Sequence, residues 1–103
     1  MKSRILRFRT LALFLVSVLT AAAVVEKTDV FISGADGYHT YRIPAMVKAA
    51  NGSLLAFAEG RKSAGGDSGN IDILLKRSAD GGRTWSPAQV VWDDAENTCG
   101  NPC

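Results

Sequence analysis

The sequence predicts an all-β protein, an antiparallel sheet of four short strands that follow one another along the chain. Three observations support this prediction. No segment after residue 25 repeats its apolar residues with the helical period of about 3.6. Short apolar runs recur instead, and turns rich in Gly, Ser and Asn separate them. Asn51-Gly52 lies between two of these runs, and this dipeptide is the strongest short-range signal for a β-hairpin.

Four apolar runs of strand length are expected to form the sheet: residues 41–48, 53–59, 71–77 and 89–92. Pro44 has no backbone N–H for the sheet ladder, so the first strand is expected to be irregular near its start. Residues 30–32 are expected to form a further brief strand, and the Gly- and Ser-rich residues 60–69 a loop.

The third expected strand carries apolar side chains on both faces: Ile71, Ile73, Leu74 and Leu75. A lone four-stranded sheet in water has nothing to cover both faces. In a β-propeller each blade is such a unit, and the neighbouring blades cover it. The pattern therefore favours one blade of a larger propeller.

Composition excludes several classes of protein. Hydrophobic residues make up 47% of the 103 residues and charged residues 21%, which excludes a disordered tail, a collagen-like fibre and a polybasic nucleic-acid arm. One histidine and two cysteines do not favour a structural zinc site, and we expect neither metal nor cofactor. Cys99 and Cys103 fit either a small disulfide ring or free thiols, and both alternatives stay open.

Residues 1–23 have the three parts of a secretory signal peptide. A basic start holds Lys2, Arg4, Arg7 and Arg9, an apolar run follows at residues 11–19, and Ala21-Ala22-Ala23 offers a cleavage site. The roughly 15 apolar-compatible positions fall short of the about 20 that span a bilayer, although a lipid or uncleaved anchor stays an alternative.

Cleavage would leave residues 24–103 as the mature domain, with eight basic and ten acidic residues and thus a formal charge of −2. This charge does not favour a nucleic-acid partner. We expect a secreted, periplasmic or cell-surface protein that meets a membrane only through its export signal.

The most specific motif is a turn of eight residues, Ser78-Ala79-Asp80-Gly81-Gly82-Arg83-Thr84-Trp85. The short side chains of Ser78 and Asp80 can bond local backbone N–H groups. Gly82 permits a positive φ, and Trp85 gives the turn a hydrophobic floor. These roles are structural, so the turn by itself predicts no chemistry.

This octet, with its pattern Ser-x-Asp-x-Gly-x-Thr-Trp, resembles the Asp-box of sialidases. Upstream, Tyr41-Arg42-Ile43-Pro44 is similar to the Arg-Ile-Pro motif near the start of the sialidase catalytic domain. Ala58-Glu59-Gly60-Arg61, residues 66–72 and Asn101-Pro102-Cys103 also match in order and spacing. An Asp-box alone also occurs in secreted non-enzymes, but all the motifs in one order are specific to sialidases.

The resemblance, which covers residues 29–103, implies the N-terminal part of a six-bladed β-propeller. It implies an exo-alpha-sialidase, a glycoside hydrolase that removes terminal sialic acid from glycoproteins, glycolipids and oligosaccharides with retention. Six blades of about 40–50 residues need on the order of 300 residues, so this chain is expected to supply the opening strand and one blade. It is expected to be inactive alone.

The resemblance also implies roles for individual residues. Arg42 matches the first of three arginines that bind the substrate carboxylate, for which a guanidinium is a bidentate partner. Asp67 matches the acid/base aspartate, which must hold a proton near neutral pH. Arg61 is expected to contact a ring hydroxyl or the carboxylate region, and Asn101 the same ring region. The structural alternatives are that Asp67 is a loop-tip turn former, that Arg42 is a surface arginine covering a strand edge, and that Arg61 is a solvated arginine.

The family's nucleophile is a tyrosine assisted by a glutamate, and both come from later blades. Tyr38 and Tyr41 precede the Arg-Ile-Pro motif and do not match that tyrosine. Glu59 and Asp72 are expected to be structural, with Asp72 paired to basic groups, and His39 to be incidental.

Two alternatives stay open. A non-catalytic secreted module could use the Asp-box turn as a carbohydrate-binding or scaffold unit, but it would not need Arg42, Arg61 and Asp67 at these spacings. A self-contained small β domain is the other alternative.

Overall fold

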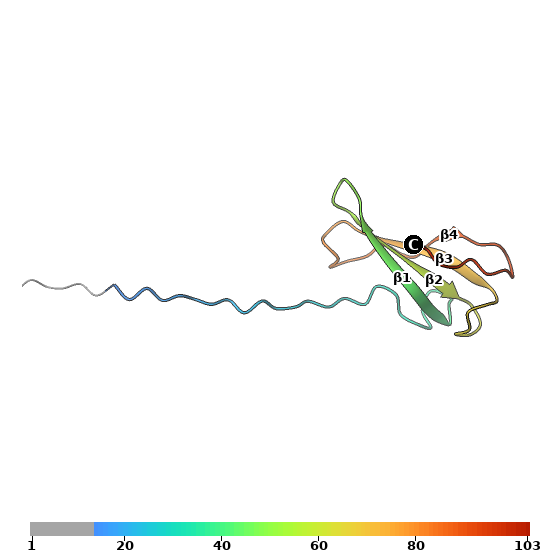
Figure 1. Ribbon diagram of the computed structural model, residues 1–103, viewed down its shortest axis with the longest axis horizontal. Coiled ribbons are helices and arrows are strands. Elements are labelled where there is room, and N and C mark those ends of the chain that lie inside the picture. The colour runs from blue at the N-terminus through green and yellow to red at the C-terminus, as the bar shows by residue number, and fades with distance from the viewer. Residues whose placement is uncertain (1–13) are drawn as a thin grey trace, which may run out of the picture.

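The folded part of the chain is a single four-stranded antiparallel sheet in the computed structural model, which describes residues 14–103 (Figure 1). The strands lie in chain order: β1 (Thr40–Lys48), β2 (Leu54–Arg61), β3 (Ile71–Ser78) and β4 (Gln89–Trp92). The predicted all-β meander is confirmed, and the bounds of the first three strands move by one or two residues.

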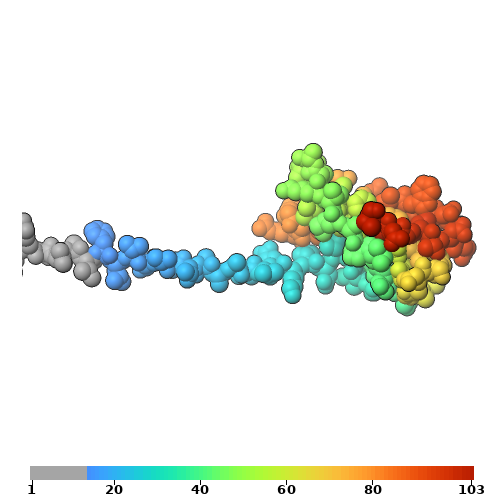
Figure 2. Space-filling view, in the orientation of Figure 1, coloured from blue at the N-terminus to red at the C-terminus, as the bar shows by residue number. Residues whose placement is uncertain are grey.

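Residues 14–29 form neither helix nor strand, their side chains are exposed, and most of the segment extends away from the sheet (Figure 2). Near its end, Glu26 lies 3.8 Å from Arg83 in the turn between β3 and β4. The first 13 residues of the expected signal peptide lie outside the described residues. Among the described residues there is no helix of the length and apolarity needed to cross a membrane.

The β1–β2 hairpin closes at Asn51-Gly52, as the dipeptide predicts. Gly52 has a φ of 87°, a left-handed conformation that glycine adopts without steric cost. The Asn51 side chain accepts a hydrogen bond from the Ser53 backbone N–H at 3.0 Å, and the Ala49 N–H donates to the Ser53 carbonyl at 2.8 Å. This turn sets the register of β1 against β2.

The predicted irregularity at Pro44 is confirmed as a shift of register in β1 between Arg42 and Ala45. Ile43, which lies inside this irregular segment, has a φ of 52°. A β-branched side chain in the left-handed region is strained, and such strain persists only where the surrounding structure imposes it. Because an irregularity of this kind changes the direction of neighbouring side chains, it affects the adjacent Arg42.

The expectation that the loop begins at Gly60 is wrong, because β2 continues through Arg61. Gly60 pairs with Tyr41 on one side and with Asp72 on the other. A Cβ at Gly60 would lie 2.6 Å from Cδ1 of Tyr38, so this strand glycine marks a close approach of a side chain to the backbone. The loop is therefore limited to residues 62–70.

The brief strand expected at residues 30–32 is not formed. Its apolar residues find side-chain partners instead of a neighbouring strand. The Phe31 ring lies 5.2 Å from the Tyr41 ring, and the Lys76 ammonium group lies 5.2 Å above the Phe31 ring and donates to the Val30 carbonyl at 2.9 Å. The outer edge of β1 has no hydrogen-bonded neighbour among the described strands, and residues 30–32 do not pair with it.

The densest packing lies on one face of the sheet, where small residues of β2 meet larger ones. Leu74 is fully buried opposite Ala58, its cross-strand neighbour. The Tyr38 hydroxyl donates to Asp72 at 2.7 Å, and the Lys62 ammonium group lies 3.3 Å from the same carboxylate. Burial, followed by the bond to Asp72, raises the pKa of Tyr38. The expected pairing of Asp72 with a basic group is confirmed.

The turn between β3 and β4 is built as its residues predict. Asp80 accepts hydrogen bonds from the backbone N–H groups of Arg83 and Thr84 and from the hydroxyls of Ser78 and Thr84. Gly82 has a φ of 92°, and the Trp85 indole N–H donates to its carbonyl at 3.1 Å. The bond from the Thr84 hydroxyl, with the others, holds the pKa of Asp80 well below its usual range.

The outer strands leave apolar side chains partly exposed: Met46 and Val47 on β1 and Val90, Val91 and Trp92 on β4, with exposed fractions between 48% and 64%. Unsatisfied strand edges and exposed apolar surface favour association of chains. We therefore expect isolated residues 24–103 to unfold without a sharp cooperative transition or to aggregate. Far-UV circular dichroism during heating tests this, and a sharp two-state melt of a soluble monomer would contradict it.

In the protein expressed from its complete coding sequence, we expect Gly60→Ala to lower the free energy of unfolding by about 1–3 kcal/mol, the usual cost of overpacking. The added methyl group would lie 2.6 Å from the Tyr38 ring, which the hydroxyl bond to Asp72 holds in place. Urea unfolding measures the change. Gly66→Ala is the matched control, since nothing lies within 4 Å of its Cβ position, and equal stability of the two variants would contradict the packing argument.

In the protein expressed from its complete coding sequence, we expect Asp80→Asn to lower the melting temperature at neutral pH, since the ionised carboxylate accepts the hydrogen bonds of the turn. A carboxyl group with a lowered pKa stabilises the fold above its ordinary value of 3.8, and this contribution is lost as the pH falls toward the lower folded-state pKa. The difference between wild type and variant should shrink below about pH 4. Thermal melts over a pH series, with exposed Asp29→Asn as control, measure it; a pH-independent difference is the contrary result.

Candidate functional site

Three charged side chains share one face at one end of the sheet. Arg42 of β1 is the direct cross-strand partner of Glu59 of β2. Arg61 follows Glu59 by two positions, and side chains two apart on a strand point to the same face. The alternation of the strands therefore brings Arg42, Glu59 and Arg61 together.

The loop of residues 62–70 adds Asp67 to this group. Its two ends are joined by a hydrogen bond from the Lys62 N–H to the Asn70 carbonyl at 3.1 Å. Arg61 holds the middle of the loop, because its Nη1 donates to the Gly65 carbonyl at 2.6 Å and to Asp67 Oδ1 at 2.9 Å. The Asp67 side chain itself is 90% exposed, so it is accessible from solvent.

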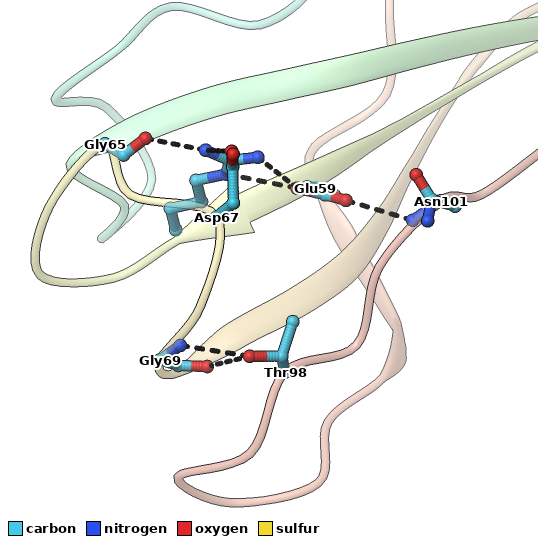
Figure 3. A network of polar contacts seen from close by, with 7 residues as sticks. Glu59, Gly65, Asp67, Gly69, Thr98 and Asn101 are labelled. Carbon is cyan, nitrogen blue, oxygen red and sulfur yellow. Dashed lines mark hydrogen bonds and ion pairs between the residues drawn. The ribbon is translucent and has the colours of Figure 1, made fainter.

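The chain after β4 returns along the start of β3 and closes the site. Thr98 forms a parallel bridge with Ile71, and the Thr98 hydroxyl accepts from the Gly69 N–H at 3.0 Å and donates to the Gly69 carbonyl at 2.9 Å. The Asn101 N–H donates to Glu59 Oε1 at 2.9 Å. Figure 3 shows the hydrogen bonds of Thr98 and Asn101, which connect the loop of Asp67 and the segment of Asn101 to the same end of the sheet.

Arg61 is the centre of the network, and only 3% of its side chain is exposed. Its Nε and Nη2 both donate to Glu59 Oε2, at 3.1 and 2.7 Å. The bonds to Glu59, more than those to Asp67, raise the pKa of Arg61. With the two bonds of Nη1, four of the five guanidinium N–H groups are occupied. Arg61 thus has one N–H left and no free fork for a second carboxylate.

The four residues that the sequence predicts as site residues all line one open recess of about 310 Å³: Arg42, Arg61, Asp67 and Asn101. The other lining residues are Ile43, Glu59, Thr98 and Gly100. This volume lies at the lower end of the roughly 300–1,000 Å³ typical of small-ligand sites. The juxtaposition is a geometric finding, and the roles of the four residues stay predictions.

Arg42 differs from Arg61 in its surroundings. Its side chain is exposed, and within residues 14–103 no carboxylate lies within ion-pair distance of it. A guanidinium with all its donors available can bind a carboxylate through two parallel hydrogen bonds. Of the two arginines in the recess, Arg42 is therefore the one suited to an anionic ligand.

Sequence reasoning did not place two of the lining residues in the recess. Glu59 was expected to be structural, and its bonds to Arg61 and Asn101 agree with that role, but its place in the recess was not expected. Its position two residues before Arg61 on a strand was the available signal. Thr98 carried no sequence signal, since a lone threonine in a turn-like segment does not indicate that it will bond a loop 29 residues away.

The remaining candidate residues take no part in the recess. His39 is exposed, and its Nδ1 lies 2.7 Å from the Thr40 hydroxyl. Cys99 is buried and Cys103 exposed, and both are free thiols. Within residues 14–103, no group of three or more His, Cys, Asp or Glu side chains could hold a metal ion.

Curated proteins similar to this chain are sialidases. An exo-alpha-sialidase of Aspergillus fumigatus is 40% identical over 72 residues, which is 64% of this chain and 18% of that protein. A sialidase of Micromonospora viridifaciens is 44% identical over 63 residues, or 61% of this chain and 10% of that protein. An exo-alpha-sialidase of Arthroderma benhamiae is 34% identical over 90 residues, which is 82% of this chain and 22% of that protein.

The chain therefore spans between a tenth and about a fifth of the length of these relatives. No family model matches the chain.

Proposed function

The chain belongs to the sialidase family over the segment that it shares with these relatives, and from this premise we propose that it is part of an exo-alpha-sialidase that releases terminal sialic acid from glycoconjugates. The observation that carries the proposal is the recess itself, where Arg42, Arg61, Asp67 and Asn101 meet. A non-catalytic module would have no need for an open arginine and an exposed carboxyl group in one recess.

In the proposed site Arg42 binds the substrate carboxylate. Sialic acid carries this carboxylate on its anomeric carbon, next to the bond that is broken. The exposed position of Arg42 and its lack of a carboxylate partner among the described residues support this role. A bidentate guanidinium contact would orient the ring as well as attract it.

Asp67 is proposed to give its proton to the leaving oxygen and to take a proton from water in the second step. Its exposed side chain on a loop above the recess supports this role, because the leaving group must be reachable from solvent. Arg61 and Asn101 would contact the ring hydroxyls, Arg61 through its one remaining N–H. The tyrosine nucleophile, its glutamate and two further arginines would come from other blades.

The sheet is proposed to be one blade of a six-bladed propeller, with residues 78–85 as its Asp-box. The half-exposed apolar side chains of β1 and β4 support this, since neighbouring blades would cover them. Residues 1–23 are proposed to be a cleaved export signal, which would place the enzyme outside the cytoplasm.

We expect Arg42→Lys to lower kcat/KM for a fluorogenic sialoside by about 100-fold, in the range measured when one preorganised charge-stabilising donor is removed. Lysine keeps the charge but loses the fork. The protein expressed from its complete coding sequence is the one to assay. Arg77→Lys, an exposed arginine of β3, is the matched control.

Unchanged activity of the Arg42→Lys protein would remove Arg42 from the site. An inactive wild-type protein that still binds sialylated glycans would favour the binding-module alternative. The coding sequence after Cys103 gives an independent check, because the proposal requires two more arginines, a glutamate and a late tyrosine there.

A further inference from the structure

Asp67, the proposed proton donor, lies beside the positively charged guanidinium of Arg61. Its carboxylate lies 2.9 Å from Arg61 Nη1, and a guanidinium at this distance favours the ionised form of a carboxyl group. A proton donor must hold a proton before it can give one away. The proposed role of Asp67 therefore requires something that offsets the charge of Arg61.

The charged groups around Asp67 identify what does so. Arg42 of β1 and both Glu59 and Arg61 of β2 line the recess, whereas the C-terminal segment contributes only the uncharged Thr98, Gly100 and Asn101. Lys62, in the same loop as Asp67, lies 3.3 Å from Asp72 and 3.8 Å from Asp93 instead. Glu59 is thus the one other acidic residue among the described lining residues.

Glu59 is well placed to neutralise Arg61. Its side chain is 6% exposed, so water screens its charge little. One oxygen, Oε2, accepts from Nε and Nη2 of Arg61 at 3.1 and 2.7 Å. The Glu59–Arg61 pair is close to neutral as a unit, and Asp67 then bonds to a guanidinium whose charge is already matched.

The other oxygen of Glu59 positions the opposite wall of the recess. Oε1 accepts from the Asn101 N–H at 2.9 Å, and a Cβ on Gly100 would lie 3.0 Å from Oε1. Asn101 has a φ of 55°, a left-handed conformation in which asparagine is several-fold enriched. A single buried carboxylate therefore constrains Arg61 and Asn101 together.

We propose that Glu59 is a positioning residue of the site, whose carboxylate neutralises Arg61 and thereby allows Asp67 to carry a proton beside a guanidinium. The proposal rests on the proposed function for its catalytic meaning. The effect of Glu59 on the protonation of Asp67 depends only on the Glu59–Arg61–Asp67 contacts. The proposal for Glu59 and the proposed enzymatic function can therefore be refuted separately.

The test compares wild type, Glu59→Gln and Glu26→Gln in the protein expressed from its complete coding sequence. Glu26 is the matched control because its contact to Arg83, at 3.8 Å, joins two side chains that are more than 70% exposed. In Glu59→Gln the charge of Arg61 acts on Asp67 alone. We expect the alkaline limb of the kcat/KM profile to move to lower pH by about one unit, a roughly tenfold loss of rate on that limb.

The control should leave the limb in place. A Glu59→Gln protein with lower activity at every pH but an unmoved limb would show a merely structural role and overturn the proposal, as would a shift to higher pH. Should Glu59→Gln not fold, the double variant Glu59→Gln with Arg61→Gln removes both buried charges at once. Its limb should lie at or above the wild-type position, and a limb below it would overturn the proposal.

A measurement without substrate separates the two proposals. The carboxyl carbon of Asp67 can be followed by NMR during a pH titration of protein labelled with ¹³C at aspartate. Its midpoint should be lower in Glu59→Gln than in wild type, and an equal or higher midpoint would overturn the role of Glu59. A wild-type protein that does not cleave sialosides would refute the proposed enzyme while this titration still decides the contact.

Discussion

The recess depends on the buried ion pair between Glu59 and Arg61. Burying two charges is costly, and their attraction offsets that cost only when further hydrogen bonds satisfy the remaining donors and acceptors. Here the Asn101 N–H satisfies the second oxygen of Glu59, and the Gly65 carbonyl and Asp67 take the other donors of Arg61. The pair therefore connects β2, the loop 62–70 and the C-terminal segment, and the bonds between Thr98 and Gly69 add a second connection between the loop and that segment.

At the end of the sheet that carries the recess, one face packs the strands together and the other lines the recess. On one face Gly60 leaves room for the Tyr38 ring, and the Tyr38–Asp72–Lys62 network fixes the strands where they must support the loop. On the other face the charged side chains of Arg42, Glu59 and Arg61 converge on a cavity. The strained Ile43 lies beside this cavity, at the register shift of β1. Backbone strain of this kind is typical of functional sites, where the surrounding structure holds a side chain in one fixed direction.

Much of this architecture follows from local sequence. Asn51-Gly52, the octet at residues 78–85 and the apolar runs predict the meander, because turn chemistry and strand alternation act over a few residues. Gly60 was misassigned because glycine usually interrupts a strand, and only the position of Tyr38 explains its place inside β2. Residues 30–32 were assigned as a strand from composition, which does not say whether a partner strand is available.

The candidate site was less predictable than the sheet. Arg42, Arg61, Asp67 and Asn101 were selected by their motifs, and spacing alone does not say that they share a recess. Convergence depends on a loop and a C-terminal segment whose contacts span 29 to 42 residues. Single-sequence patterns carry no information at that range, which is why Thr98 was missed and Glu59 undervalued.

Those long separations have a consequence for how the protein forms. Hairpins form between segments that are neighbours in the sequence. Contacts between distant residues form later, because closing a larger loop costs more conformational entropy before the contact stabilises it. The strands can pair before Thr98 and Asn101 make their contacts. During synthesis, the last dozen residues described here must leave the ribosome before the pocket takes shape, so the scaffold precedes the chemistry that it supports.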